Sequence, residues 1–202
     1  MIAAFIEELL IVFVRLLVGA QARWQGCGHS PEQRIYIANH TSHLDVVLLF
    51  SALPESLRRR TRPVAAAEYW TAGPIRRYLI HAIFRGVLIE RDRSQLNPLE
   101  PAASALRQRD SLIFFPEGTR GPGEDLQPLK PGIFLLASWF PKVDIVPVWI
   151  DNSYRILPKG FAIPVPLLCS ITFGTPFRWK EGQKQEDFLA EVRKALEALQ
   201  PH

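Results

Sequence analysis

The sequence places two side chains, His40 and Asp45, at a spacing that allows a base and its orienting partner. A histidine that removes a proton needs a group that fixes its tautomer and stabilises the imidazolium. Within one helix, five residues turn the second side chain about 140° away from the first, so the two meet only where a strand passes into a helix. The pattern predicts that corner, with a strand over 34–39, Ser42 as the helix cap and Asp45 at the third helical position, pointing back toward the imidazole.

Two other interpretations of these residues stay open at the level of the sequence. Ser42 and Asp45 have the spacing of a capping box, in which the carboxylate binds only main-chain N–H groups. His40, His43 and Asp45 are also compatible with a metal site, because His-x-x-His can share a helical face. The lack of further clustered ligands disfavours the metal site.

A second polar cluster follows a predicted strand over 111–115. Gly118 permits a tight turn, and Thr119 and Arg120 offer hydrogen-bond donors at its mouth. The guanidinium group binds phosphate through two charge-assisted hydrogen bonds, which are stronger than neutral ones. Alone, the same residues are also typical of an ordinary turn with a surface ion pair between Glu117 and Arg120.

A third cluster, Arg91 and Arg93, follows a predicted strand over 86–90. One of these arginines could bind the same phosphate as Arg120. Ligands of α/β proteins usually bind in the loops that follow the strands. The polar residues of the three loops are therefore expected to lie together.

Taken together, the three clusters resemble the glycerolipid acyltransferases, the family that contains the 1-acylglycerol-3-phosphate O-acyltransferases. The similarity covers roughly residues 30–175 and follows the family's order, and the first and third blocks carry most of its specificity. The matching blocks are NHTSHLD at 39–45, GVLIER at 86–91, FPEGTR at 115–120 and IVPV at 145–148. The segment LKPGIFLLA at 129–137 also resembles the basic segment that precedes the family's last block.

The resemblance implies a role for each matching residue. His40 would be the general base, and Asp45 would orient it. Arg91 and Arg120 would hold the acceptor's phosphate. The remaining residues implied in substrate binding are Glu117 and Gly118, which would shape the acceptor site, Thr119, Lys130, and Val146 and Pro147 near the acyl or acceptor pocket.

The resemblance also implies the reaction. A fatty acyl group would move from acyl-CoA or an acyl carrier protein to the hydroxyl of a lysophospholipid, foremost 1-acylglycerol-3-phosphate, giving phosphatidic acid in phospholipid biosynthesis. No metal or other cofactor is expected, because the thioester supplies the driving force. Glu90 stands where the family commonly has aspartate, and Pro131 follows Lys130 where a small or basic residue is usual. These departures leave another lysolipid or lipid-like alcohol open as the acceptor.

The elements that must position these residues alternate along the chain. Strands are predicted over 34–39, 63–67, 86–90, 111–115, 145–150 and 170–174, and helices over 44–52, 75–84, 97–108, 132–140 and 185–199. This alternation predicts a single α/β domain over 25–202, with a central mixed, mostly parallel sheet flanked by helices. An apolar N-terminal helix is expected to precede it, over 1–24.

The N-terminal helix has a broad apolar face and a narrow charged sector. Glu7, Glu8 and Arg15 form the charged sector and interrupt the apolar run, which argues against a membrane-spanning helix. Such a helix lies in a membrane interface or packs on the domain. We expect peripheral or monotopic contact with the cytoplasmic face of a membrane, and a buried core helix is the alternative.

The positive charge of the chain is concentrated in one segment. Residues 54–93 contain nine arginines and four acidic residues and so carry a formal charge of +5, in a chain of +4. Such a field suits a membrane surface, a phosphorylated substrate or an acidic carrier protein, although the run 58–60 alone is equally typical of a solvated loop. Nucleic acid is disfavoured because the aromatic residues do not alternate with the arginines. A non-catalytic basic membrane-binding protein is the alternative from another class.

Overall fold

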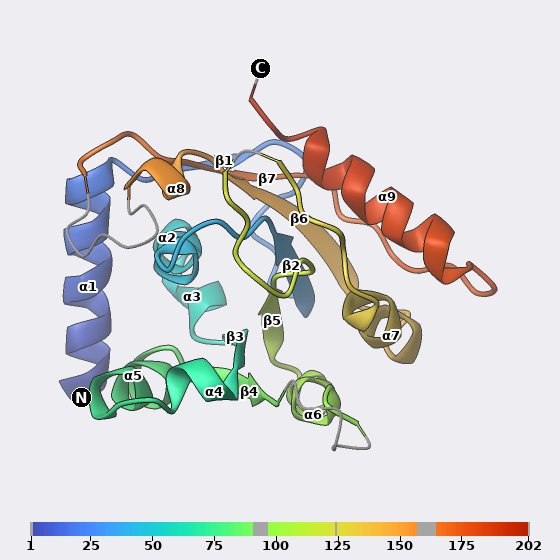
Figure 1. Ribbon diagram of the computed structural model, residues 1–202, viewed down its shortest axis with the longest axis horizontal. Helices are drawn as coiled ribbons and strands as arrows, with labels where there is room; N and C mark the ends of the chain where they lie inside the picture. Colours follow the sequence, from blue (N-terminus) through green and yellow to red (C-terminus); the bar gives the residue numbers. More distant parts are fainter. Residues whose placement is uncertain (1, 91–96, 124, 157–164, 202) are drawn as a thin grey trace.

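The computed structural model describes residues 2–90, 97–123, 125–156 and 165–201. Within them, seven strands form one sheet in the order β1-β7-β6-β2-β5-β3-β4, with helices on both faces (Figure 1). Neighbouring strands are parallel except β6 and β7, which are antiparallel. The predicted α/β domain with a mixed, mostly parallel sheet is thus confirmed.

The described elements follow the predicted order, with four short additions. The strands are β1 (Gln21–Trp24), β2 (Arg34–Ala38), β3 (Thr61–Ala66), β4 (Val87–Ile89), β5 (Ser111–Phe114), β6 (Asp144–Ile150) and β7 (Ser170–Phe173). The helices are α1 (Ile2–Val18), α2 (Asp45–Ala52), α3 (Glu55–Arg58), α4 (Ala67–Trp70), α5 (Pro74–Tyr78), the π-helix η1 (Leu79–Ile83), α6 (Glu100–Arg107), α7 (Gly132–Trp139), α8 (Ser153–Ile156) and α9 (Gln185–Glu197). The additions to the prediction are β1, α3, α4 and α8.

The central strand β2 is buried along its whole length and separates two hydrophobic cores. Tyr36 and Ala38 belong to the core covered by α1, α2 and η1, whereas Ile35 and Ile37 belong to the core covered by α6, α7 and α9. A continuous apolar run is typical of a parallel strand that helices cover on both faces. The carboxyl end of β2 is therefore held from both sides.

Helix α1 packs against α2 and the α3 corner and turns its charged side chains toward them. The guanidinium of Arg58, only 4% exposed, donates to Glu7 Oε1 at 2.9 Å and to Glu8 Oε2 at 2.7 Å. Arg15 Nε donates to the main-chain oxygen of Ser51 at 3.0 Å. Arg58 therefore belongs to an ion-pair network that attaches α1, whereas the sequence also allowed a solvated loop at this position.

The first helix is shorter than the sequence predicts. It ends at Val18, because Gly19 takes a left-handed conformation (φ 51°) that does not continue a right-handed helix. Residues 21–24, expected within the N-terminal helix, instead form β1, which pairs in parallel with β7 at the edge of the sheet. In the described residues, no helix combines the length and the apolar character that crossing a membrane requires.

Candidate active site

A cleft of about 480 Å³ opens at the carboxyl ends of β2, β3, β4 and β5. Helix α4 borders it on one side and α7 on the other. Most of its polar lining comes from the loops after β2 and β5, Glu90 after β4 and Tyr69 on α4 add to it, and the rest is apolar. The apolar lining residues include Val46, Val64, Ala65, Trp70, Ile89, Leu99, Phe114, Phe115 and Leu135. The cleft therefore combines a polar reaction edge with a surface suited to a hydrocarbon chain.

His40 and Asp45 meet at the strand-to-helix corner where β2 passes into α2. His40 Nδ1 lies 2.7 Å from Asp45 Oδ2, and the imidazole stacks on Phe115 with ring centroids 4.2 Å apart. The Asp45 side chain is fully buried, whereas that of His40 is 21% exposed and lines the cleft. Because a carboxylate only accepts, Nδ1 carries the hydrogen, and Nε2 is the ring nitrogen that remains for a proton from the cleft.

The Asp45 carboxylate also holds the loop that carries His40. Its Oδ2 accepts the main-chain N–H groups of Thr41 at 2.7 Å and Ser42 at 2.9 Å. Helix α2 begins at Asp45 with Leu44 as its cap, so Ser42 lies further from the helix than the sequence predicts. The capping contacts and the imidazole contact, which the sequence leaves as alternatives, are both present on one carboxylate oxygen.

No metal cluster accompanies this pair in the described residues. Among them, no group of three His, Cys, Asp or Glu side chains is arranged to hold an ion. His43 stacks on Tyr69, with ring centroids 4.9 Å apart. The Arg76 guanidinium lies over the Tyr69 ring, 4.4 Å from its centroid.

The electrostatic environment of His43 keeps its imidazole neutral. Desolvation lowers the pKa of His43 to about 4, the positive charges of Arg120 and Arg76 and the protonated form of His40 add to the shift, and Asp45 opposes it. At neutral pH, His43 therefore contributes an uncharged ring to the wall of the cleft.

Glu117 bonds to the loop that carries His40. It is 1% exposed, and its Oε1 accepts the main-chain N–H of His40 at 2.7 Å while Oε2 accepts that of Gln127 at 2.9 Å. Burial raises the pKa of the Glu117 carboxyl, and the two amide donors oppose that shift. The cleft lining does not include Glu117, so its carboxylate supports the loop that presents the imidazole.

The backbone conformation at Gly118 favours glycine, and the Lys130 side chain lies close to this residue. Its φ is 66°, in the left-handed region that favours glycine. A Cβ at this position would lie 2.8 Å from Lys130 Cδ. The turn therefore brings the Lys130 side chain against the main chain at the mouth of the cleft.

The other predicted binding residues separate into three groups. Thr119, Arg120 and Lys130 line the cleft together with Gly118. Val146 and Pro147 are buried within β6 and are not part of that lining. Arg91 lies outside the described residues.

Two further groups of residues at the site have no role in the sequence-based prediction. Tyr69 and Trp70 line the cleft from α4, directly after β3. The rule that loops after strands bind ligands could have found them, because they follow a predicted strand just as His40 does.

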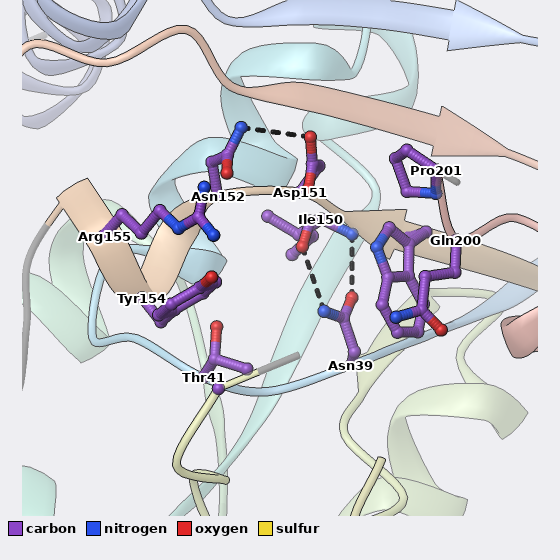
Figure 2. A pocket seen from close by; sticks show the side chains of 11 residues that line it. Asn39, Thr41, Ile150, Asp151, Asn152, Tyr154, Arg155, Gln200 and Pro201 are labelled. Carbon is purple, nitrogen blue, oxygen red and sulfur yellow. Dashed lines mark hydrogen bonds between the residues drawn. The ribbon is translucent and has the colours of Figure 1, made fainter. Parts of the chain in front are cut away.

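The second group lines a polar cavity of about 240 Å³. Asn39 and Thr41 of this group belong to the first matching sequence block but receive no role of their own in the prediction, whereas Asp151 and Asn152 are not predicted. Figure 2 shows Thr41 and Asn39 along one wall of this cavity, with Asp151 and Asn152 across from them. The Asn39 amide donates to the main-chain oxygen of Ile150 at 2.9 Å and accepts its N–H at 2.7 Å. These two bonds connect the end of β2 to the end of β6.

Comparison with known proteins gives a consistent result. Residues 24–151 match the family model described as Acyltransferase. Human 1-acyl-sn-glycerol-3-phosphate acyltransferase alpha is 31% identical over 157 residues, which are 74% of this chain and 52% of the human protein. The 1-acyl-sn-glycerol-3-phosphate acyltransferase of Limnanthes alba is 31% identical over 161 residues, 75% of this chain and 53% of the plant protein. The chain thus spans about half the length of the curated relatives it matches.

Among solved structures, the fold is similar to the crystal structure of the 1-acyl-sn-glycerophosphate (LPA) acyltransferase PlsC from Thermotoga maritima. The TM-score is 0.73 at 21% sequence identity, covering 99% of this chain and 82% of the other. This similarity concerns the fold and includes the N-terminal part of the chain.

Proposed function

The chain belongs to the acyltransferase family, and from that premise we propose that it transfers a fatty acyl group from a thioester to the hydroxyl of a lysophospholipid. The preferred acceptor is 1-acylglycerol-3-phosphate and the product is phosphatidic acid, which places the reaction in phospholipid biosynthesis. Two curated relatives that each match about three quarters of this chain carry that activity in their names.

One observation carries this proposal. An imidazole whose Nδ1 lies 2.7 Å from a fully buried carboxylate faces a largely apolar cleft that also contains Arg120 and Lys130. A base is needed to activate a hydroxyl, cations are needed to bind a phosphate, and an apolar surface is needed to hold an acyl chain. The cleft provides all three within one site.

The mechanism is direct acyl transfer. His40 Nε2 removes the proton of the acceptor hydroxyl as its oxygen attacks the thioester carbonyl carbon, and Asp45 stabilises the imidazolium through Nδ1–H. The carbon–sulfur bond then breaks, and the imidazolium returns the proton to the departing thiolate. General base catalysis contributes about 10²–10⁴-fold to such a rate, and fixed positions of the reactants contribute further.

Acceptor recognition is assigned to the cations on the β5 side of the cleft. Arg120 and Lys130 would bind the phosphate, with the Thr119 hydroxyl as an additional donor. Arg91 is proposed as a further phosphate ligand on the basis of its position in the sequence motif. Because a guanidinium and a phosphate form two parallel charge-assisted bonds, Arg120 would orient the acceptor as well as bind it.

The donor is a thioester of coenzyme A or of an acyl carrier protein, and we propose no metal or other cofactor. A covalent acyl-enzyme is not part of the mechanism. The sequence has no Gly-x-Ser-x-Gly motif, and burial together with the carboxylates of Asp45 and Asp151 raises the pKa of the Cys169 thiol to about 12. That thiol stays protonated at neutral pH and is a poor nucleophile.

We further propose peripheral or monotopic contact with the cytoplasmic face of a membrane through α1. The charged side chains of α1, those of Glu7, Glu8 and Arg15, bond to the domain. The opposite side of the helix is apolar. The exposed residues of that side are Ile2, Phe5, Leu9, Val12, Phe13 and Leu16. Such a face suits the boundary between head groups and acyl chains, and the basic segment 54–93 suits an anionic leaflet.

The test is acyl transfer by the purified protein in detergent or vesicles. Lysophosphatidic acid and long-chain acyl-CoA should give phosphatidic acid and free thiol in equal amounts. A panel of other lysolipids and an acyl carrier protein thioester would then rank acceptors and donors. If no acceptor yields product with either donor, the proposal is wrong and a non-catalytic membrane-binding role takes its place.

A further inference from the structure

The orientation of the Asp45 carboxylate toward His40 depends in part on the main chain of Thr41. The same oxygen that faces His40 Nδ1 accepts the Thr41 N–H at 2.7 Å and the Ser42 N–H at 2.9 Å, so the Thr41 bond is the shorter of the two main-chain contacts. The other carboxylate oxygen, Oδ1, is buried and has no hydrogen-bond partner among the described residues. Since one oxygen carries the polar contacts that orient the carboxylate, a shift of the Thr41 peptide would move the partner of the imidazole.

The two residues before Thr41 are bonded to two different parts of the sheet. On the β5 side, Glu117 accepts the N–H of His40, and the His40 oxygen accepts the N–H of Gly121 at 2.7 Å. On the β6 side, Asn39 bonds to Ile150 as described above (Figure 2). The Gly121 bond also holds the peptide plane that contains the Thr41 N–H, but none of these bonds reaches the Thr41 side chain.

A buried hydroxyl on α8 holds Thr41. Thr41 Oγ1 lies 2.6 Å from Ser153 Oγ, and Ser153 is 0% exposed. Ser153 is the first residue of α8 and comes just after Asn152, which has a left-handed backbone conformation (φ 62°). The hydroxyl pair thus joins the catalytic loop, residues 39–45, to the start of α8, 112 residues away in the chain.

We propose that Ser153 is a positioning residue for the acyl transfer, and that it acts through the Thr41 hydroxyl to hold the Thr41 N–H on the carboxylate that orients His40. The expected effect on turnover rests on the proposed function, whereas the effect of Ser153 on the position of the Thr41 N–H does not. Small displacements of a catalytic group can lower a rate by as much as about 10²-fold. Loss of the hydroxyl pair should therefore affect turnover more than acceptor binding.

The test compares Thr41→Val, Ser153→Ala and their double variant with the wild type. Each single variant should lower kcat about 10-fold and leave KM for lysophosphatidic acid nearly unchanged. The double variant should be no slower than the worse single variant, because both remove the same contact. Thr41→Ser keeps the hydroxyl and should restore most of the turnover.

Two matched controls remove buried hydroxyls that bond only to main-chain oxygens outside the site. Thr61→Val removes the bond from Thr61 Oγ1 to Leu57 O, and Ser51→Ala removes the bond from Ser51 Oγ to Leu48 O. Both should turn over like the wild type. If the controls lose as much kcat as the site variants, or if the effects of Thr41→Val and Ser153→Ala multiply, the inference is overturned.

A second readout does not require activity. The downfield proton resonance of His40 Nδ1–H, assigned by its loss in His40→Gln, should shift or broaden in Thr41→Val and Ser153→Ala and stay in place in both controls. An unchanged resonance in the site variants would contradict the inference even if the wild type were inactive. Absence of wild-type turnover would count against the proposed function alone.

Discussion

The catalytic loop, residues 39–45, and helix α1 are both held on the domain by polar contacts. In the loop these contacts present an imidazole to the cleft, and in α1 they present apolar side chains to the surface. In the loop, the contacts of Asp45, Glu117 and Asn39 leave one edge of the His40 imidazole facing the cleft. In α1, the contacts of Arg58 and Ser51 with the charged sector leave a row of apolar side chains facing away from the domain.

The two regions differ in burial, and this difference assigns them different tasks. The loop contains a fully buried carboxylate, one oxygen of which has no hydrogen-bond partner in the part of the chain that the structure describes, while the other oxygen holds the loop. The contacts of α1 are partly exposed, since the Glu8 side chain is 54% exposed. Rigid, buried contacts suit the positioning of a proton acceptor, whereas the α1 contacts need only keep a helix on the surface.

The largest expected effect comes from Asp45→Asn in the catalytic loop. The amide can still accept an N–H from Thr41 but cannot stabilise an imidazolium, so kcat should fall by about 10²–10⁴-fold. Steady-state kinetics at saturating donor and acceptor measure this. Asp144→Asn, which removes a carboxylate paired with Arg178 at the start of β6, should stay close to the wild type. Equal kcat values for the two variants would remove the distinction between the loop and the rest of the domain.

Arg58→Gln tests how α1 is attached. Its pairs with Glu7 and Glu8 are partly buried, so the free energy of unfolding should fall by about 2 kcal/mol, between the values of exposed and buried pairs. Thermal unfolding should show a Tm lower by about 4–8 °C. The neighbouring control, Arg59→Gln, removes an exposed i,i+4 pair with Glu55 and should change stability by less than about 0.5 kcal/mol. Similar Tm values for both variants would mean that the network does not hold α1.

Leu16→Ser tests the outward face of α1. Leu16 is 81% exposed, and burying a leucine in an apolar phase contributes about 1.5–3 kcal/mol. Partition onto anionic vesicles should therefore weaken by about tenfold, as measured by co-sedimentation. Trp139→Ser removes an exposed apolar side chain from α7 on the other face of the sheet and should leave partition unchanged. Equal losses in both variants would contradict a specific role for α1.

The smallest effect concerns His43. Because its folded pKa of about 4 lies below the unfolded value of about 6.5, the unfolded chain binds more protons between these values. His43 therefore lowers stability as the pH falls from about 6.5 to 4, and it has no such effect above that window. His43→Gln should flatten the dependence of Tm on pH by one or two degrees across this window, since water screens the exposed ring. An unchanged slope would show that His43 titrates normally.

The local part of the site could be predicted from the sequence. The contact between His40 and Asp45 follows from a strand pattern, a helix pattern and a six-residue interval, all within one short segment. The apolar strands and the helices between them likewise follow from periodicity. What the sequence leaves open is whether Asp45 binds the imidazole or only main-chain amides, and the structure shows both contacts.

The non-local part could not be predicted, because it depends on which strands are neighbours. The bond between Thr41 and Ser153 exists only because β6 lies beside β2, and nothing near either residue specifies that pairing. The strand β1 is similar. Its four residues are mostly exposed, and they form a strand because they pair with β7, about 150 residues later in the chain. The role of Glu117 under the His40 amide also depends on the β2–β5 pairing.

The most direct test of the account uses His40→Gln on vesicles that carry lysophosphatidic acid, supplied with acyl-CoA. The account predicts that this variant co-sediments with the vesicles as the wild type does but forms no phosphatidic acid above background, because α1 is intact while the base is lost. If His40→Gln forms product at a rate close to that of the wild type, His40 is not the base and the proposed mechanism is wrong.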